Sequence, residues 1–140
     1  MSNKIGNFES IEAAREFFKG DRFATESGIM IEELEPGRSI CSFEISKHHL
    51  NAEGGLMGGA TFTLIDFAFA TASSCIHRPT VAMQVSVNYL NAVKGKKLTA
   101  KAECKKDGRA TCVYIVTVTD DAGRDIAHAV LTGYKVQNKN

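Results

Sequence analysis

The sequence predicts an α+β fold: a curved antiparallel sheet of about six strands wraps around one long central helix, with a short helix at the N-terminus. Residues 60–72 would form a helix with almost no polar face, and in a chain of 140 residues such a helix needs a sheet around it. The second half of the chain then alternates apolar and polar residues between turn segments. No linker, repeat or low-complexity tract interrupts this pattern, so we expect a single domain over residues 1–140.

The N-terminal third predicts one helix and two strands. Ser10 is placed to cap a helix that runs to about Lys19, and Gly20 is placed to end it. A period-two pattern then predicts strands over residues 23–34 and 38–46, joined by a turn at residues 35–37.

The chain after the central helix predicts four more strands. Arg78-Pro79 is expected to end the helix. In the strand that follows, alternation places Val81 and Val85 on one face and Ala82 on the other. The expected strands cover residues 80–89, 98–105, 110–119 and 125–136, and turns with hairpin chemistry separate the last three, at residues 106–109 and 120–124.

Composition and charge exclude several function classes. The chain has 17 Lys and Arg residues against 16 Asp and Glu, and a net charge of +1 gives no overall field to hold nucleic acid or an anionic membrane. No window reaches the ~18 apolar residues of a membrane span, and the N-terminus lacks a secretory apolar stretch. We therefore expect a cytoplasmic protein with neither nucleic acid nor membrane as partner.

The cysteines indicate core packing. They form no C-x-x-C pair, and most stand among apolar neighbours, which favours reduced core thiols over disulfides or metal ligands. We expect no metal site. The four residues are Cys41, Cys75, Cys104 and Cys112.

A glycine-rich segment before the central helix is the first candidate site. Residues 54–59 contain four glycines, and they stand where the first N–H groups of the helix point outward and carry partial positive charge. Gly58 or Gly59 can therefore donate a hydrogen bond to a substrate carbonyl and to the oxyanion that it becomes. The alternative is a glycine-rich turn that serves packing only.

Asp66 is the second candidate. It lies among Leu64, Ile65 and Phe67 in a helix that we expect to be buried, where a carboxylate is unfavourable unless it is paired or functional. Partial loss of water would raise its pKa and suit a base that works near neutral pH. The alternative is an aspartate that is hydrogen-bonded to Ser, Thr or backbone donors inside the core.

Helix geometry separates the two candidates within one chain. Asp66 lies eight residues after Gly58, about 12 Å further along a straight helix at ~1.5 Å per residue. If both serve one site, the aspartate should come from an antiparallel helix of a second subunit, as two-fold symmetry supplies.

The residues of this segment resemble a known family. The pattern His49-x-Asn51-x-x-Gly54-x-x-Met57-Gly58-Gly59, with Asp66 fifteen residues after Asn51, is similar to the active-site segment of PaaI-like acyl-CoA thioesterases of the hotdog fold. Their pattern is H-x-N-x-x-G-x-x-H-G-G followed by L-x-D. The resemblance implies a sheet around a long helix, paired two-fold and often assembled as a dimer of dimers, a homotetramer.

The resemblance also implies roles for individual residues. Asn51 would orient the attacking water or bind near the thioester, the Gly58 amide would bind its carbonyl oxygen, and Asp66 of the neighbouring subunit would act as general base or nucleophile. His49, Met57, Gly59 and Ala82 would contact the substrate. The acyl-CoA would lie along the subunit boundary, with coenzyme A as part of the substrate and no further cofactor.

Two departures from the family pattern keep other functions open. Met57 replaces the histidine of H-G-G and can neither donate a hydrogen bond nor hold a proton, and Ala82 stands where Thr or Ser is common. They motivate the alternative of a non-catalytic acyl-CoA-binding protein. A hydratase or dehydratase of the same fold would need a His beside an acid, and the helix has none. An oligomeric scaffold would neither bind nor turn over acyl-CoA.

The acyl preference depends on a pocket between the helices. The residues expected to contribute to it are Leu56, Met57, Phe62 and Met83.

Overall fold

The six predicted strands form one antiparallel sheet in the computed structural model, which describes residues 3–137. The order across the sheet is β1-β2-β4-β5-β6-β3, so the β1–β2 hairpin forms one edge and β3 the other. The strands are β1 (Met30–Glu35), β2 (Arg38–Glu44), β3 (Thr80–Tyr89), β4 (Lys97–Asp107), β5 (Thr111–Asp120) and β6 (Asp125–Lys135).

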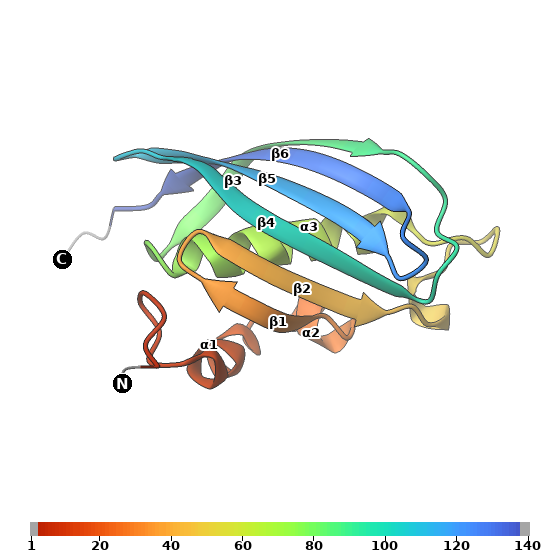
Figure 1. Ribbon diagram of the computed structural model, residues 1–140, viewed down its shortest axis with the longest axis horizontal. Coiled ribbons are helices and arrows are strands. Elements are labelled where there is room, and N and C mark those ends of the chain that lie inside the picture. The colour runs from red at the N-terminus through yellow and green to blue at the C-terminus, as the bar shows by residue number, and fades with distance from the viewer. Residues whose placement is uncertain (1–2, 138–140) are drawn as a thin grey trace.

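The long helix α3 (Gly58–Ser74) lies across the concave side of this sheet (Figure 1). It contacts β1 through β6, and Leu64, Ile65 and Phe69 have almost no exposed surface. The predicted helix with a sheet curved around it is therefore confirmed. None of the described helices is long and apolar enough to cross a membrane.

The predicted N-terminal helix is confirmed as α1 (Ile11–Phe18). The Ser10 side chain accepts a hydrogen bond from the Ala13 N–H at 3.0 Å, which satisfies one of the free donors of the first turn. Ala14 and Phe18 of α1 are buried, and the helix lies beside the β1–β2 hairpin (Figure 1).

The strand predicted over residues 23–34 is wrong in its first half. The segment Arg22–Glu26 forms a short helix, α2, and β1 begins only at Met30. Two local features account for this: Ser27 Oγ donates to the Phe23 carbonyl at 2.9 Å and closes the helical turn, and Gly28 has φ +89°, which interrupts an extended strand.

The end of α3 also differs from the expectation. The helix ends at Ser74, and the N–H groups of Ile76 and His77 both bond to the Ser73 carbonyl at 3.0 Å. Pro79 therefore lies beyond the helix, in the turn that leads into β3.

A bulge in β3 overturns the predicted face assignment. The pairing register of β3 with β6 shifts between Ala82 and Gln84. Ala82 consequently pairs with buried Gly133 on the inner face, whereas Val81 pairs with exposed Tyr134 on the outer face. Strict alternation predicts Val81 on the same face as Val85 and Ala82 on the other face. In the structure Ala82 shares the inner face with Val85, because one extra residue in a strand exchanges its two faces beyond that point.

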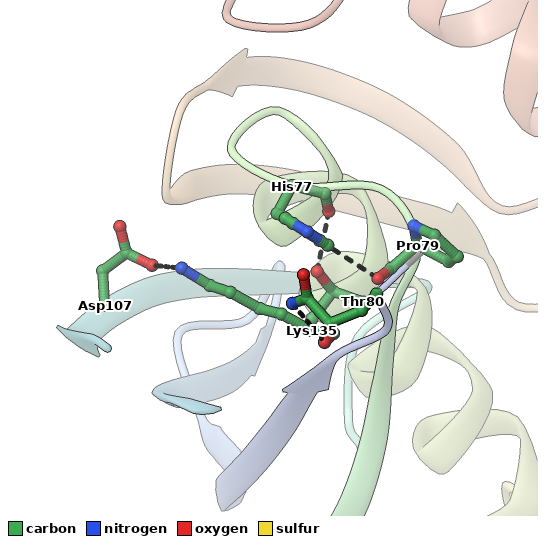
Figure 2. Close-up of polar contacts among 6 residues, drawn as sticks. His77, Pro79, Thr80, Asp107 and Lys135 are labelled. Atoms are coloured by element: carbon green, nitrogen blue, oxygen red, sulfur yellow. Dashed lines mark hydrogen bonds and ion pairs between the residues drawn. The ribbon is translucent and has the colours of Figure 1, made fainter. Parts of the chain in front are cut away.

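Polar contacts fix the turn before β3 and join the ends of β4 and β6 (Figure 2). Thr80 Oγ1 donates to the His77 carbonyl at 2.7 Å, and His77 Nδ1 donates to the Pro79 carbonyl at 3.2 Å, which fixes the start of β3. Lys135 of β6 forms an ion pair with Asp107 of β4. The Lys135 side chain is buried, and its ion pair connects β6 with β4 across the intervening strand β5.

The cysteines are free thiols, as predicted. Three are buried and Cys104 is half-buried. Burial raises the pKa of Cys41 to about 11, so this side chain stays a neutral thiol in the core.

Candidate active site

The N-terminus of α3 has free amide donors. Met57 precedes the helix with φ −69° and ψ 133°, and no side chain caps this end. Among the described residues, no acceptor bonds to the N–H groups of Gly58 and Gly59, whereas the Ala60 N–H bonds to the Met57 carbonyl. Two unpaired donors at the positive end of a helix dipole can bind a carbonyl oxygen that gains negative charge.

The Asn51 side chain shapes the loop before α3. Its Oδ1 accepts from the Glu53 N–H at 2.9 Å and from the Gly55 N–H at 3.0 Å. Gly54 has φ +83°, a conformation that glycine adopts without strain. Within residues 3–137 the Nδ2 group of Asn51 has no partner, so the exposed side chain can still donate to a substrate or water.

His49 anchors this loop to the protein interior. Its Nδ1 accepts from the Ser46 N–H at 2.9 Å, and its Nε2 donates to the Ser27 carbonyl at 2.7 Å. The ring is buried and packs against Phe43 with 4.3 Å between ring centroids. Both nitrogens are therefore engaged in holding the Asn51 loop against α2.

Tyr89 is a site residue that sequence reasoning missed. From the edge strand β3 its hydroxyl donates to the Gly58 carbonyl at 3.0 Å, and so holds the first residue of α3. In the sequence Tyr89 is one more apolar residue of an alternating strand, and no spacing connects it with Gly58.

Asp66 lies on the exposed face of α3 within one chain, so the prediction of a buried position is wrong. The sheet covers the opposite face of the helix, and the Asp66 face also carries exposed Phe62. The alternative of an aspartate bonded inside the core is wrong as well, because in the described part of the chain its carboxylate has neither a hydrogen bond nor an ion pair.

The surroundings of Asp66 favour its protonated form. Although the Asp66 side chain is partly exposed, neighbouring atoms exclude some water from its carboxyl group and raise its pKa, and the negative charge of Asp21 raises the pKa further. Asp21 precedes α2, makes no capping hydrogen bond with its side chain, and lines the same cavity as Asp66. Sequence reasoning did not identify Asp21, since nothing in a spacing of 45 residues indicates that α2 folds back onto α3.

Most of the predicted site residues line one or another of three separate cavities along α3. Gly58 lines a cavity of about 520 Å³ with Tyr89 and the glycines of the Asn51 loop. His49, Met57 and Gly59 line a second cavity, of about 370 Å³, on the α2 side of the helix start. Asp66 and Asp21 line a third, of about 480 Å³, further along the helix.

The single chain therefore brings together only part of the predicted site. The Asn51 loop and the free amides of α3 are neighbours, while Asp66 and Gly58 of one chain share none of these cavities. Ala82, on the inner face of β3, lines none of the three. Within residues 3–137, no group of three or more His, Cys, Asp or Glu side chains is placed to hold a metal ion.

Comparisons with known proteins agree with this architecture. The family model described as the thioesterase superfamily matches residues 53–127, from the Asn51 loop into β6. A putative esterase of Archaeoglobus fulgidus is 32% identical over 130 residues, which are 91% of this chain and 84% of that protein.

Two proteins of known structure are also similar. The acyl-coenzyme A thioesterase PaaI of Escherichia coli is 27% identical over 81% of this chain and 82% of its own. Its solved structure matches with a TM-score of 0.84 over 91% and 94% of the chains, and at 23% identity supports the fold alone. A hypothetical thioesterase of Streptococcus pneumoniae, solved with coenzyme A, matches with a TM-score of 0.79 at 30% identity over 88% and 99%. The chain belongs to the thioesterase superfamily, as a PaaI-like thioester hydrolase of the hotdog fold.

Proposed function

We propose that the protein hydrolyses the thioester bond of an acyl-CoA to a free acid and coenzyme A. The Gly58 N–H binds the thioester carbonyl oxygen, Asn51 positions the reactants, and Asp66 of a second copy acts as general base or nucleophile. Two similar proteins support the substrate class: one carries the name acyl-coenzyme A thioesterase, and the other was solved with coenzyme A.

The chemistry needs few groups. With Asp66 as base, a water oxygen bonds to the carbonyl carbon while its proton passes to the carboxylate, and the oxyanion accepts from the Gly58 N–H. Collapse breaks the C–S bond, and the thiolate takes the proton as coenzyme A leaves. With Asp66 as nucleophile, the acyl group first forms an anhydride with the carboxylate, which water then hydrolyses.

The observation that carries the proposal is that one chain holds two incomplete half-sites at separate places on α3. One half has unpaired amide donors at the start of α3, and the other has an unpaired carboxylate of raised pKa about 12 Å along the same helix, at ~1.5 Å per residue. A two-fold axis that sets two α3 helices antiparallel would bring each Asp66 to the other chain's Gly58.

A second copy is therefore part of the proposed mechanism. β3 forms an edge of the sheet and exposes Met83 and Tyr89, and Tyr89 also contacts the first residue of α3. Such an edge with uncovered apolar side chains favours association of copies. We propose a dimer, or a dimer of dimers, with acyl-CoA along the boundary and coenzyme A as part of the substrate rather than a cofactor.

The test is thiol release from a panel of short, medium and aromatic acyl-CoAs. We expect turnover by the native protein and a fall of at least a hundredfold in kcat for Asp66→Asn, since the base or nucleophile is lost. Asn51→Ala should lower kcat as well. Glu53→Gln, an exposed change in the same loop, is the matched control. Native turnover in both Asp66→Asn and Asn51→Ala would refute the assigned roles.

A non-catalytic acyl-CoA-binding protein is the second candidate. It is favoured by Met57, which stands half-exposed at the start of α3 and offers no donor or base there. This candidate predicts saturable binding of acyl-CoA, measured by calorimetry, without thiol release on long incubation. Release of thiol that depends on Asp66 would exclude it.

A further inference from the structure

The cavity between α2 and the start of α3 has a wall of apolar side chains. Its volume is about 370 Å³, and it opens beside Gly59, one of the two residues with an unpaired N–H at the helix start. The apolar side chains that line it are Phe23, Ile29, Phe43, Met57, Ala60 and Phe62. A space of this size and lining suits a small apolar ligand.

Three apolar side chains at this cavity are uncovered in the chain. Phe23 is 79% exposed, Met57 51% and Phe62 39%. Exposed aromatic side chains that gather around a hollow indicate that something apolar covers them.

The polar side chains of the cavity wall are already engaged. Both ring nitrogens of His49 have partners, Ser27 Oγ donates to the Phe23 carbonyl at 2.9 Å, and Thr63 Oγ1 donates to the Gly59 carbonyl at 2.8 Å. His48 is exposed and is the one further polar side chain on the wall. A hydroxyl or carboxylate placed against the apolar side chains of this cavity, away from His48, would therefore lose its water without gaining a side-chain donor.

We infer that this cavity binds the acyl group of the substrate and selects an unsubstituted hydrocarbon acyl group over one that ends in a polar or charged group. The inference rests on the proposed function, because the thioester carbonyl must lie at the adjacent amides for the acyl group to enter here. Phe23, from α2, is the specificity-determining residue, since it extends over the cavity from outside α3 and the sheet.

The test compares hexanoyl-CoA with adipoyl-CoA, which has the same length and a terminal carboxylate, and uses acetyl-CoA as reference. We expect kcat/KM to be at least tenfold higher for hexanoyl-CoA than for adipoyl-CoA, because burial of an unpaired carboxylate is strongly unfavourable. Equal values for the two six-carbon substrates would overturn the inference.

Two variants localise the selectivity. Phe23→Ala removes an exposed side chain and leaves the core intact, and it should lower the hexanoyl-to-acetyl ratio of kcat/KM about tenfold. Ala60→Leu fills the cavity from α3 and should lower the same ratio. Met30→Ala, an exposed apolar change outside this cavity, is the control. If Phe23→Ala changes the oligomeric state by light scattering and leaves the ratio unchanged, a second copy covers Phe23 and the inference is wrong.

Binding measurements separate this inference from the proposed function. Calorimetry on Asp66→Asn compares the affinity for hexanoyl-CoA and adipoyl-CoA without hydrolysis. A tenfold preference for hexanoyl-CoA supports the acyl site even where the native protein releases no thiol, an outcome that refutes hydrolysis alone. Equal affinities overturn the acyl site even where hydrolysis is fast.

Discussion

Gly58 contributes a backbone group to the proposed chemistry, and that group can be removed by substitution. As the first residue of α3, Gly58 occupies the position where proline fits a helix, and Met57 already has the extended conformation that precedes proline. Gly58→Pro should keep the helix and delete the N–H. We expect kcat to fall about 10²–10³-fold, as for loss of one oxyanion donor.

The matched control for this change is Gly58→Ala, which keeps the N–H. A Cβ at this position would lie 3.5 Å from Tyr89, an ordinary contact, so the alanine variant should fold and retain most activity. Circular dichroism checks the helix content of both variants. Native kcat in a folded Gly58→Pro protein would rule out the Gly58 donor.

Asp21 should control the pH dependence of the reaction through Asp66. Asp66 acts in its ionised form, so kcat/KM should rise with pH through the pKa of Asp66, which lies above its ordinary value. Asp21→Asn removes the neighbouring negative charge and should lower that pKa. The acidic limb of the kcat/KM profile should then move to lower pH, with little change in kcat at alkaline pH. An unmoved limb would show that the two carboxyl groups do not interact.

The sequence predicted where the candidate site residues stand in the fold better than it predicted the surroundings of each residue. The spacing from His49 to Asp66 pointed to the segment that the structure places at the start and along the exposed face of α3. The exposure of Asp66 was missed because an apolar neighbour in sequence can lie on the other side of a helix. Tyr89 and Asp21 come from elements distant in sequence, and only the packing of those elements reveals their contacts.

The β5–β6 turn holds the segment between β3 and β4 through one carboxylate. Asp120 Oδ2 accepts from the N–H groups of Lys94 and Gly95, and Oδ1 accepts from those of Ala122 and Arg124, at 2.9–3.0 Å. These four bonds, with that from Arg124 the strongest influence, lower the pKa of Asp120 to about 2. The fold therefore depends on the charge of this residue.

Asp120→Asn should weaken the protein most at neutral pH. A pKa that is lower in the folded state than in the unfolded chain gives stability above the unfolded value of about 3.9 and loses it as the pH falls towards 2. The variant should therefore have a lower free energy of unfolding at pH 7 and a flatter dependence between pH 4 and 2. Urea unfolding across that range measures both. Parallel curves for the two proteins would contradict this role.

At the scale of elements, strong periodic patterns predicted the fold and local breaks were missed. The four later strands and α3 were expected at nearly their observed positions, because long alternating or uniformly apolar segments have one compatible structure. The error at α2 arose because five residues are too few to show a helical period, and a Ser hydroxyl bond and Gly28 decide the local conformation.

For the whole molecule, the proposed mechanism requires that one site uses two chains. Asp66→Asn and Gly58→Pro proteins should each be inactive alone. When they are mixed at equal amounts and subunits are exchanged, half of the dimers are mixed, and each mixed dimer regains one intact site of two. We therefore expect about a quarter of the native specific activity. Light scattering confirms assembly, and a mixture without activity despite exchange would place each site within one chain.

The bulge in β3 changes which residues of this strand face the inside of the sheet. Even-numbered residues face inward from Thr80 to the bulge, and odd-numbered residues face inward after it, as Val85 and Val87 do. Deleting Met83 would remove the extra residue and restore strict alternation, so Ala82 would stay on the inner face and Val81 on the outer face. The bulge can therefore absorb the loss of one residue, whereas a deletion elsewhere in β3 would turn part of the free edge inside out.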